Sequence, residues 1–190
     1  MKSILISIRP KWCEKIASGD KTIEVRKTRP KLELPFRCYI YCTLQGTPEF
    51  FRETLCGDVA KWNRGKWAER KGNVIGEFIC DEFIEFHAHS VAPACYANFA
   101  RMAPDEIHGY LGNKDGFGWH ISGLKIYDKP KRVSEFWYPP EKYCEKEFCG
   151  GCPGDQVADV NGEYSYDCEW RRPLSRPPQS WCYVEGSDAK

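Results

Sequence analysis

The sequence predicts a mixed α+β fold in a single domain. Short strand-like runs dominate both halves of the chain, and a few short helix-like segments separate them. The 190 residues lie within the usual range of one domain, and 42% apolar residues are enough to build one core. No internal repeat or low-complexity segment interrupts this pattern. We therefore treat residues 1–190 as one domain.

The first elements are a strand, a helix and two strands, predicted at residues 4–8, 10–18, 21–28 and 36–43. Pro10 suits the first position of a helix, and Gly19 can adopt the left-handed conformation that ends one. Trp12 and Ile16 lie four residues apart, so they share one face of this helix. The chain therefore begins as β-α-β-β.

The predicted strand over 21–28 carries a regular pattern of charges. Alternate side chains of a strand share a face. One face would carry Lys21, Ile23, Val25 and Lys27, and the other Thr22, Glu24, Arg26 and Thr28. The first face suits a core, whereas the second presents an acid beside a base. On composition alone, Glu24 and Arg26 are typical of a solvated ion pair.

The rest of the chain predicts further short elements around one irregular stretch. Glycines, tryptophans and charges between 45 and 73 indicate an insertion without regular structure. After it we expect one long strand at 74–86, helices at 94–100 and 104–112, strands at 119–121 and 124–127, a turn at 128–130, and a closing strand at 181–185.

A motif near the start resembles that of the ASCH domain family, a branch of the PUA-like fold. The matching residues are Gly19, Lys21, Thr22, Glu24 and Arg26. Three further segments, 118–122, 126–130 and 177–185, resemble the versions of this domain found in phage and prophage proteins. Together these segments span almost the whole chain. The resemblance implies a small PUA-like β-barrel with flanking helices and a cleft beside the first helix.

The resemblance also implies a ligand, because this family is proposed to bind RNA or modified nucleosides in that cleft. The residues expected to contact it are Lys11, Trp12, Lys21, Thr22, Glu24, Arg26, Gln179 and Ser180. Trp12 could stack on a base, and the carboxylate of Glu24 could accept hydrogen bonds from one. Trp181 is more simply a core residue, and His120 a hydrogen-bonded structural histidine.

Two other functions stay open. The first is hydrolysis of RNA or a nucleoside, with Lys21 as electrostatic stabiliser, Glu24 as acid and base, and Arg26 orienting Glu24. Family members that resemble acetylcytidine amidohydrolases use a lysine and a threonine three residues later, but here Glu24 takes the threonine position. That mechanism therefore does not transfer directly. The second is a phage-encoded module that occupies a host protein through an aromatic surface.

The net charge and the absence of two common motifs exclude several classes of function. With 28 basic and 27 acidic side chains the net charge is +1, so any nucleic-acid site must be local. Neither a glycine-rich phosphate loop nor a nucleophile elbow is present. Residues 1–9 do not resemble a signal peptide and no apolar run approaches membrane-spanning length, so we expect a cytoplasmic protein without membrane contact.

Eleven cysteines point to a structural metal. Within a predicted Cys-rich lobe at 141–176, Cys149 and Cys152 form a CxxC motif flanked by Cys144 and Cys168. Four thiolates at this spacing favour a tetrahedral structural zinc site. Free thiols, a redox pair at the CxxC motif and an iron–sulfur cluster are the alternatives. Five other cysteines are expected to be small core residues: Cys13, Cys38, Cys42, Cys80 and Cys182.

Overall fold

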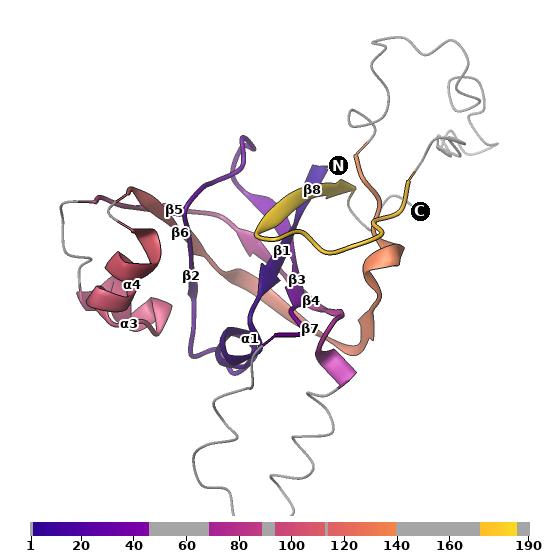
Figure 1. Ribbon diagram of the computed structural model, residues 1–190, viewed down its shortest axis with the longest axis horizontal. Coiled ribbons are helices and arrows are strands. Elements are labelled where there is room, and N and C mark those ends of the chain that lie inside the picture. The colour runs from indigo at the N-terminus through magenta and orange to yellow at the C-terminus, as the bar shows by residue number, and fades with distance from the viewer. Residues whose placement is uncertain (1, 46–68, 89–93, 113, 140–171, 186–190) are drawn as a thin grey trace, which may run out of the picture.

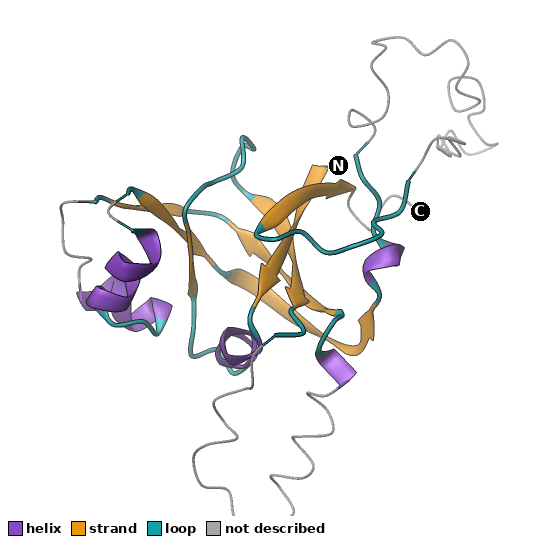
Figure 2. Cartoon of the chain, in the orientation of Figure 1, coloured by secondary structure: helices purple, strands orange, loops and turns teal. Residues whose placement is uncertain are grey.

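The computed structural model describes residues 2–45, 69–88, 94–112, 114–139 and 172–185. In these residues the strands form two sheets, with helices at their ends and on one outer face (Figures 1 and 2). The predicted mixed α+β fold is thereby confirmed. The predicted closed barrel is not seen in the described residues, because their strands form two separate hydrogen-bonded sheets instead of one closed sheet.

The larger sheet has five strands in the order β7-β4-β3-β1-β8. Their bounds are β1 Lys2–Ile8, β3 Phe36–Cys42, β4 Val74–Cys80, β7 Ser122–Lys131 and β8 Trp181–Glu185. β1 and β3 run parallel, because the chain between them, which includes the first helix, is long enough to cross back over the sheet. The other neighbouring strands run antiparallel. β8 thus adds the C-terminal end of the described chain beside its first strand.

The smaller sheet is antiparallel, with the order β2-β6-β5. It consists of β2 Ile23–Arg26, β6 Gly116–His120 and β5 Phe83–Phe86. Two helices, α3 Ala94–Ala100 and α4 Pro104–Leu111, pack on the face of β2 that carries Ile23 and Val25 (Figure 1). The predicted glycine stop of α4 is confirmed, because Gly112 has a φ of 64°.

The main core lies between the two sheets and is closed at one end by α1 Pro10–Ala17. Side chains of β1 meet Trp119 of β6 there, and Trp119 is fully buried. A second core on the other face of the larger sheet joins Tyr39 to Phe136, which follows the short 3₁₀ helix η2 Val133–Glu135. Because both of its faces are covered, β3 is buried along almost its whole length.

Two predicted elements were wrong. The expected long strand over 74–86 is two strands in different sheets, because the chain leaves the larger sheet after Cys80. The expected turn at 128–130 is part of β7. β7 is an edge strand of its sheet, so Pro130, which lacks an N–H, need not interrupt the ladder. The predicted first strands and all three helices agree with the structure to within a few residues.

Most of the predicted insertion, residues 46–68, and most of the Cys-rich lobe, residues 141–171, lie outside the described residues. Among the helices that are described, none has the length and apolar character needed to cross a membrane.

Candidate functional site

Three charged side chains are buried together at β2. Lys21, Glu24 and Arg26 are 1%, 5% and 6% exposed. The carboxylate of Glu24 stands between the two cations: its Oε2 is 3.4 Å from Lys21 Nζ, and its Oε1 is 2.9 Å from Arg26 Nη2. The pair is therefore not the solvated one that composition alone favours. We call these three residues the charged cluster.

The strand geometry explains why the charged cluster faces inward. Glu24 and Arg26 lie two residues apart on β2, directly opposite Trp119 and Phe117 of β6, so all four side chains share the face toward the main core. Lys21 precedes the strand, and its side chain turns to Glu24. The predicted face that joined Lys21 to Ile23 and Val25 was therefore wrong, because period-two alternation holds only within the strand.

Lys21 connects three elements. Its ammonium group donates a hydrogen bond of 2.7 Å to the carbonyl of Ala100, the last residue of α3. The same nitrogen lies 5.0 Å from the ring centre of Trp12 on α1. Burial lowers the pKa of Lys21, and the neighbouring Glu24 carboxylate offsets part of that shift. Lys21 therefore fixes α3 against β2 while its charge is held in a poorly solvated place.

Arg26 connects β2 to β1 and to the segment before β8. Its Nη2 donates to the carbonyl of Ser7 at 2.6 Å, and its Nη1 donates to Ser180 Oγ at 3.3 Å. The carbonyl of Ser180 also accepts a hydrogen bond from the backbone N–H of Ser7. The structure thus brings Ser180, one of the predicted contact residues, to the charged cluster.

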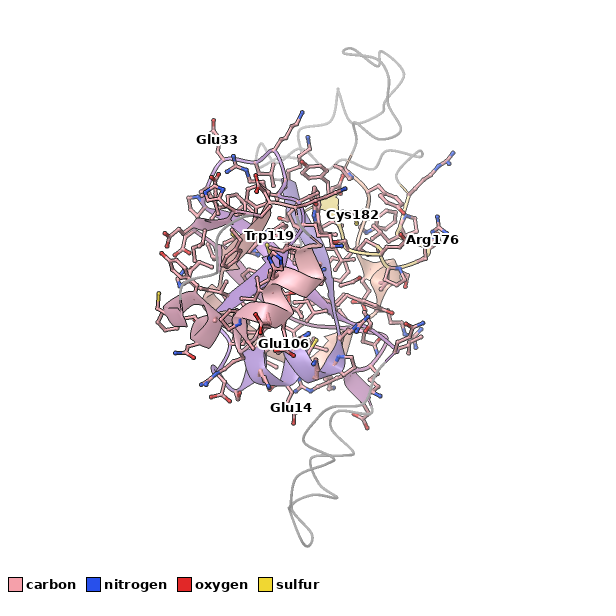
Figure 3. All side chains as sticks on the ribbon, turned by 60° about the vertical axis from the view of Figure 1, so that its left-hand side comes forward. Glu14, Glu33, Glu106, Trp119, Arg176 and Cys182 are labelled. Atoms are coloured by element: carbon pink, nitrogen blue, oxygen red, sulfur yellow. The ribbon has the colours of Figure 1, made fainter. Side chains whose placement is uncertain are left out.

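Two buried N–H donors, one in the charged cluster and one next to it, have no hydrogen-bond partner in the described part of the chain. They are Arg26 Nε and Trp119 Nε1. Figure 3 labels Trp119, whose side chain lies in the interior. An unsatisfied buried donor costs about 1–3 kcal/mol, so native proteins keep few of them. Both residues lie on the same face of the smaller sheet as Glu24.

Positive charge and aromatic rings surround the charged cluster. The ammonium groups of Lys11 and Lys15 lie 4.2 and 5.2 Å from the ring centre of Trp12, which Lys21 also approaches. Tyr110 of α4 interacts electrostatically with Arg26, and burial raises the pKa of the Tyr110 hydroxyl. Sequence reasoning missed Tyr110, and only its position three residues from Ile107 on one helix offered a signal.

The remaining predicted contact residues lie farther out. Thr22 is half-buried, and its backbone pairs with Phe99 and Ile121. Gln179 is exposed. Trp181, which the sequence predicts as a core residue and not as a contact residue, is half-buried. Its ring centre lies 6.0 Å from that of Trp119, and its Nε1 donates to Thr28 Oγ1 at 3.1 Å. A packing role for Trp181 agrees with these contacts.

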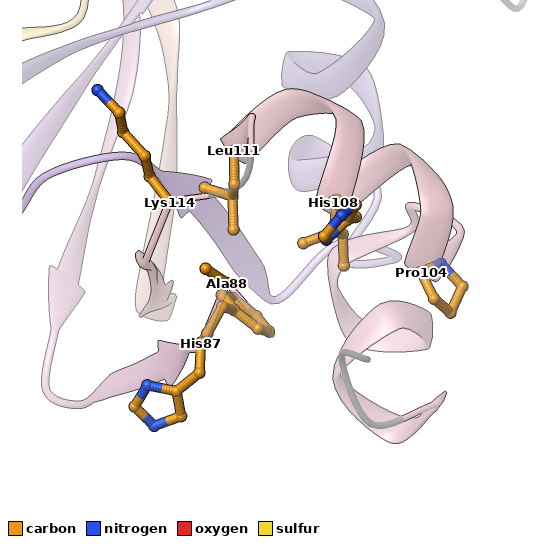
Figure 4. Close-up of a pocket in the computed structure, with 8 residues that line it drawn as sticks. His87, Ala88, Pro104, His108, Leu111 and Lys114 are labelled. Atoms are coloured by element: carbon orange, nitrogen blue, oxygen red, sulfur yellow. The ribbon is translucent and has the colours of Figure 1, made fainter. Parts of the chain in front are cut away.

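Two hollows lie near the helices, and neither is lined by the charged cluster. An open groove of about 310 Å³ runs beside Lys15 of α1 and past Arg101 and Pro104. Figure 4 shows a second hollow at α4, where Leu111 and Ala88 lie on either side and His87 points away. It has room for about 10 Å³, which is one water at most. The groove beside α1 is therefore the larger of the two.

The sequence matches no protein-family model and no curated protein. Among solved structures, the chain is similar to the ASCH protein of Zymomonas mobilis, with 16% identity and a TM-score of 0.53 over 98% of this chain and 90% of that one. Two single-site variants of that protein give the same picture. The tyrosine-to-phenylalanine variant has 16% identity and a TM-score of 0.53 over 100% and 94% of the two chains. The serine-to-alanine variant has 15% identity and a TM-score of 0.54 over 98% and 90%.

The chain has the ASCH-domain fold. The similarity covers nearly all of both chains, and at this identity it concerns the fold alone. The three residues of the charged cluster belong to the five-residue motif that resembles the family: Gly19, Lys21, Thr22, Glu24 and Arg26. The resemblance to phage and prophage versions stays a prediction.

The cysteine predictions divide in two. Cys13, Cys38, Cys42 and Cys80 are buried, as predicted, whereas Cys182 is half-buried. The predicted zinc ligands Cys144, Cys149, Cys152 and Cys168 lie outside the described residues. Among the residues that are described, no three histidine, cysteine or acidic side chains gather as a metal site. Zinc therefore stays a prediction.

The described residues on either side of 140–171 pair with each other. Trp137 and Pro173 form a β-bridge, and the backbone N–H of Leu174 donates to the carbonyl of Phe136 at 2.8 Å.

We expect purified protein to contain about one zinc ion per chain. Replacing Cys149 by serine should remove most of it, because three thiolates hold zinc more weakly than four. Cys95→Ser is the control, since Cys95 is exposed on α3 and outside the proposed ligand set. Elemental analysis measures the content, and less than about half a zinc per chain would count against the site.

The lowered pKa of Lys21 predicts a pH dependence of stability. As pH rises, the folded state loses this proton before the unfolded state does, so the unfolded state binds more protons in that interval. The free energy of unfolding of the wild type, relative to Lys21→Met, should therefore rise as the pH approaches the ordinary lysine pKa of about 10.4 from below. Urea titrations at several pH values measure this difference. A difference that stays flat or falls over this pH interval would contradict the expected rise.

Proposed function

We propose that the protein binds RNA or a modified nucleoside beside α1, with Lys21, Glu24 and Arg26 as the centre of the site. The observation that carries this proposal is the burial of three charges in one network. Buried ion pairs add little net stability, because removing both charges from water costs about as much as their attraction returns. Such networks in a protein interior are therefore candidates for function.

The chemistry of the charged cluster suits a nucleobase with attached phosphate. Glu24 can accept hydrogen bonds from amino or imino groups of a base, while Lys21 and Arg26 can bind carbonyl or phosphate oxygens. The unpartnered donors at Arg26 Nε and Trp119 Nε1 add two positions that an acceptor would satisfy. A ligand carrying acceptors would thus relieve a cost that the free protein bears.

The surroundings of the charged cluster favour an anionic ligand. Lys11 and Lys15 gather around Trp12, next to the groove beside α1. With a net charge of +1 on the whole chain, this is a local positive patch. Binding should therefore weaken only modestly with salt, because few phosphates are neutralised.

Hydrolysis is the second candidate, and one observation favours it. A lysine with a lowered pKa beside a carboxylate is an arrangement that enzymes use for acid and base steps. In this reaction Lys21 would stabilise developing negative charge and Glu24 would transfer the proton. The amidohydrolase-like pattern needs a threonine where this chain has Glu24. A ribonuclease-type reaction can use Lys21 and Glu24 as they stand, so it fits the residues of this chain better.

Short RNAs and acylated cytidines separate the two candidates. The wild type should bind at least one of these ligands, and Lys21→Ala should reduce the affinity about tenfold or more, as loss of a charged contact does. Lys125→Ala is the matched control, because Lys125 is exposed on β7 of the larger sheet. Circular dichroism checks that each variant is folded. Turnover that disappears in Lys21→Ala would establish the enzyme, and binding without turnover would exclude it for these substrates.

A further inference from the structure

The open groove beside α1 has a volume of about 310 Å³, at the lower end of the range for ligand sites. Lys15 lines it from α1. Asn98, Arg101 and Pro104 line it from the end of α3 to the start of α4. The described residues that line it include two cations and no acid. Binding of one base at the charged cluster leaves this groove unused.

The groove and the charged cluster are adjacent. The ammonium nitrogens of Lys15 and Lys21 lie 5.2 and 5.0 Å from the centre of the same ring, that of Trp12. The backbone N–H of Lys21 also donates to the carbonyl of Lys15 at 2.9 Å. From the other helix, the carbonyl of Ala100 accepts the Lys21 ammonium, and Arg101 is the next residue. A ligand held at Lys21 is thus next to both cations of the groove.

Arg101 occupies a backbone position that favours glycine. Its φ is 53°, in the left-handed region. The end of α3 is a Schellman motif, in which the N–H of Arg101 donates to the carbonyl of Asn98 at 3.1 Å. The N–H of Met102 donates to the carbonyl of Ala97 at 3.1 Å. Glycine is usual at this position because a β-carbon disfavours the conformation, and other residues that adopt it are concentrated at functional sites.

The ion pair with Asp20 does not account for an arginine at this position. Arg101 Nε donates to the carbonyl of Asp20 at 2.8 Å, and its Nη2 donates to Asp20 Oδ1 at 3.4 Å. These two side chains are 49% and 57% exposed, and exposed pairs add little stability. The described residues therefore use two of the five N–H donors of the guanidinium. The others remain for a ligand, in the planar arrangement that matches phosphate oxygens.

We propose that the ligand is an RNA chain, in which one base lies at the charged cluster and the neighbouring phosphates lie in the groove beside α1. This inference rests on the proposed function and narrows its ligand to a polynucleotide. Lys15, half-buried at the groove, offers a point charge, and Arg101 offers a forked contact to one phosphate. Glu106, at the start of α4, accepts the N–H of Ala103 at 2.8 Å. A single nucleotide would leave the groove empty, so the affinity should increase with chain length.

Binding of RNAs of different length tests this inference. Mononucleotides and mixed-sequence tetranucleotides are titrated into the full-length protein, and isothermal titration calorimetry measures each dissociation constant. We expect the tetranucleotides to bind about tenfold more tightly than the mononucleotides, as an added charged contact does. Nucleoside triphosphates are a third ligand, because they carry more charge without a second nucleotide.

Arg101→Gly is the sharpest variant, since glycine keeps the left-handed backbone and removes only the side chain. It should stay folded and reduce the tenfold preference for tetranucleotides to about onefold. The slope of log affinity against log salt for tetranucleotides should fall by about 0.7, the value for one phosphate of a single strand. Lys125→Ala, on β7, is the control and should change neither quantity.

Asp20→Asn gives a result of opposite sign. It removes the carboxylate that competes with phosphate for Arg101, so the tetranucleotide affinity should rise. An affinity that falls in Asp20→Asn, or a preference that Arg101→Gly leaves intact, would overturn the inference. Nucleoside triphosphates that bind as tightly as tetranucleotides would also overturn it, because charge without a chain would then fill the groove.

Failure of this inference differs from failure of the proposed function. Equal affinity for mononucleotides and tetranucleotides, reduced for both by Lys21→Ala, would overturn the RNA chain and leave binding at the charged cluster intact. Tetranucleotide binding that Lys21→Ala does not weaken would overturn the proposed function, and this inference with it.

Discussion

Replacement of Glu24 by glutamine is expected to lower the free energy of unfolding by about 3–5 kcal/mol. Glu24 is the only acid in the charged cluster, and its carboxylate contacts both Lys21 and Arg26. Glutamine keeps the shape but removes the charge, which leaves two buried cations beside each other without compensation. Chemical denaturation with urea or guanidinium measures the loss.

The matched control is an ion pair on the surface. Asp20 and Arg101 lie 3.4 Å apart, with side chains 57% and 49% exposed. Asp20→Asn should therefore change the free energy of unfolding by less than about 1 kcal/mol. Adding Lys21→Met to Glu24→Gln should recover part of the loss, since it removes one of the two uncompensated cations. Equal effects of Glu24→Gln and Asp20→Asn would show that the cluster is not desolvated as described.

Replacement of Trp119 by alanine is expected to cost about 3–5 kcal/mol of stability. Trp119 is fully buried, and its ring centre lies 6.0 Å from that of Phe36 and 5.8 Å from that of Phe83. Alanine would leave a cavity where the two sheets meet, and the rigid aromatic neighbours can close it only in part. Thermal and chemical unfolding measure the loss.

Trp181 is the control for this second prediction. It contacts Trp119 and Tyr183 but is half-buried, so Trp181→Ala removes less buried surface. We expect Trp181→Ala to cost clearly less than Trp119→Ala. A larger loss for Trp181 would place the centre of the core at β8 instead of β6.

The elements that the sequence predicted well are those with local signals. Pro10 and Gly19 bound α1 through their own backbone restrictions, and Gly112 does the same at the end of α4. The break after Cys80 has no such signal. The residues of 74–86 are apolar on both sides of it, and only the assignment of β4 and β5 to different sheets separates them. That assignment depends on tertiary pairing, which one local window does not contain.

The candidate site was predictable in its residue types and not in its burial. Glu24 and Arg26 share a strand face, as period-two alternation predicts. Their removal from solvent depends on β6 and on the segment before β8, which join β2 from far along the chain. Tyr110 lies on α4, so its electrostatic interaction with Arg26 also depends on how α4 packs. The spacing of the motif therefore predicts which charged residues share a strand face, whereas their burial depends on contacts with segments far along the chain.

The measurement that tests the central claim most directly is a crystal structure with a bound ligand. Crystals soaked with short RNAs and with modified nucleosides show where the ligand lies. We predict a base or phosphate beside α1, within about 3.2 Å of Lys21, Glu24 or Arg26 side-chain atoms, with an acceptor at Arg26 Nε or Trp119 Nε1. Ligand bound only at a different surface, such as the exposed face of β7, with the charged cluster unchanged, would contradict the proposed site.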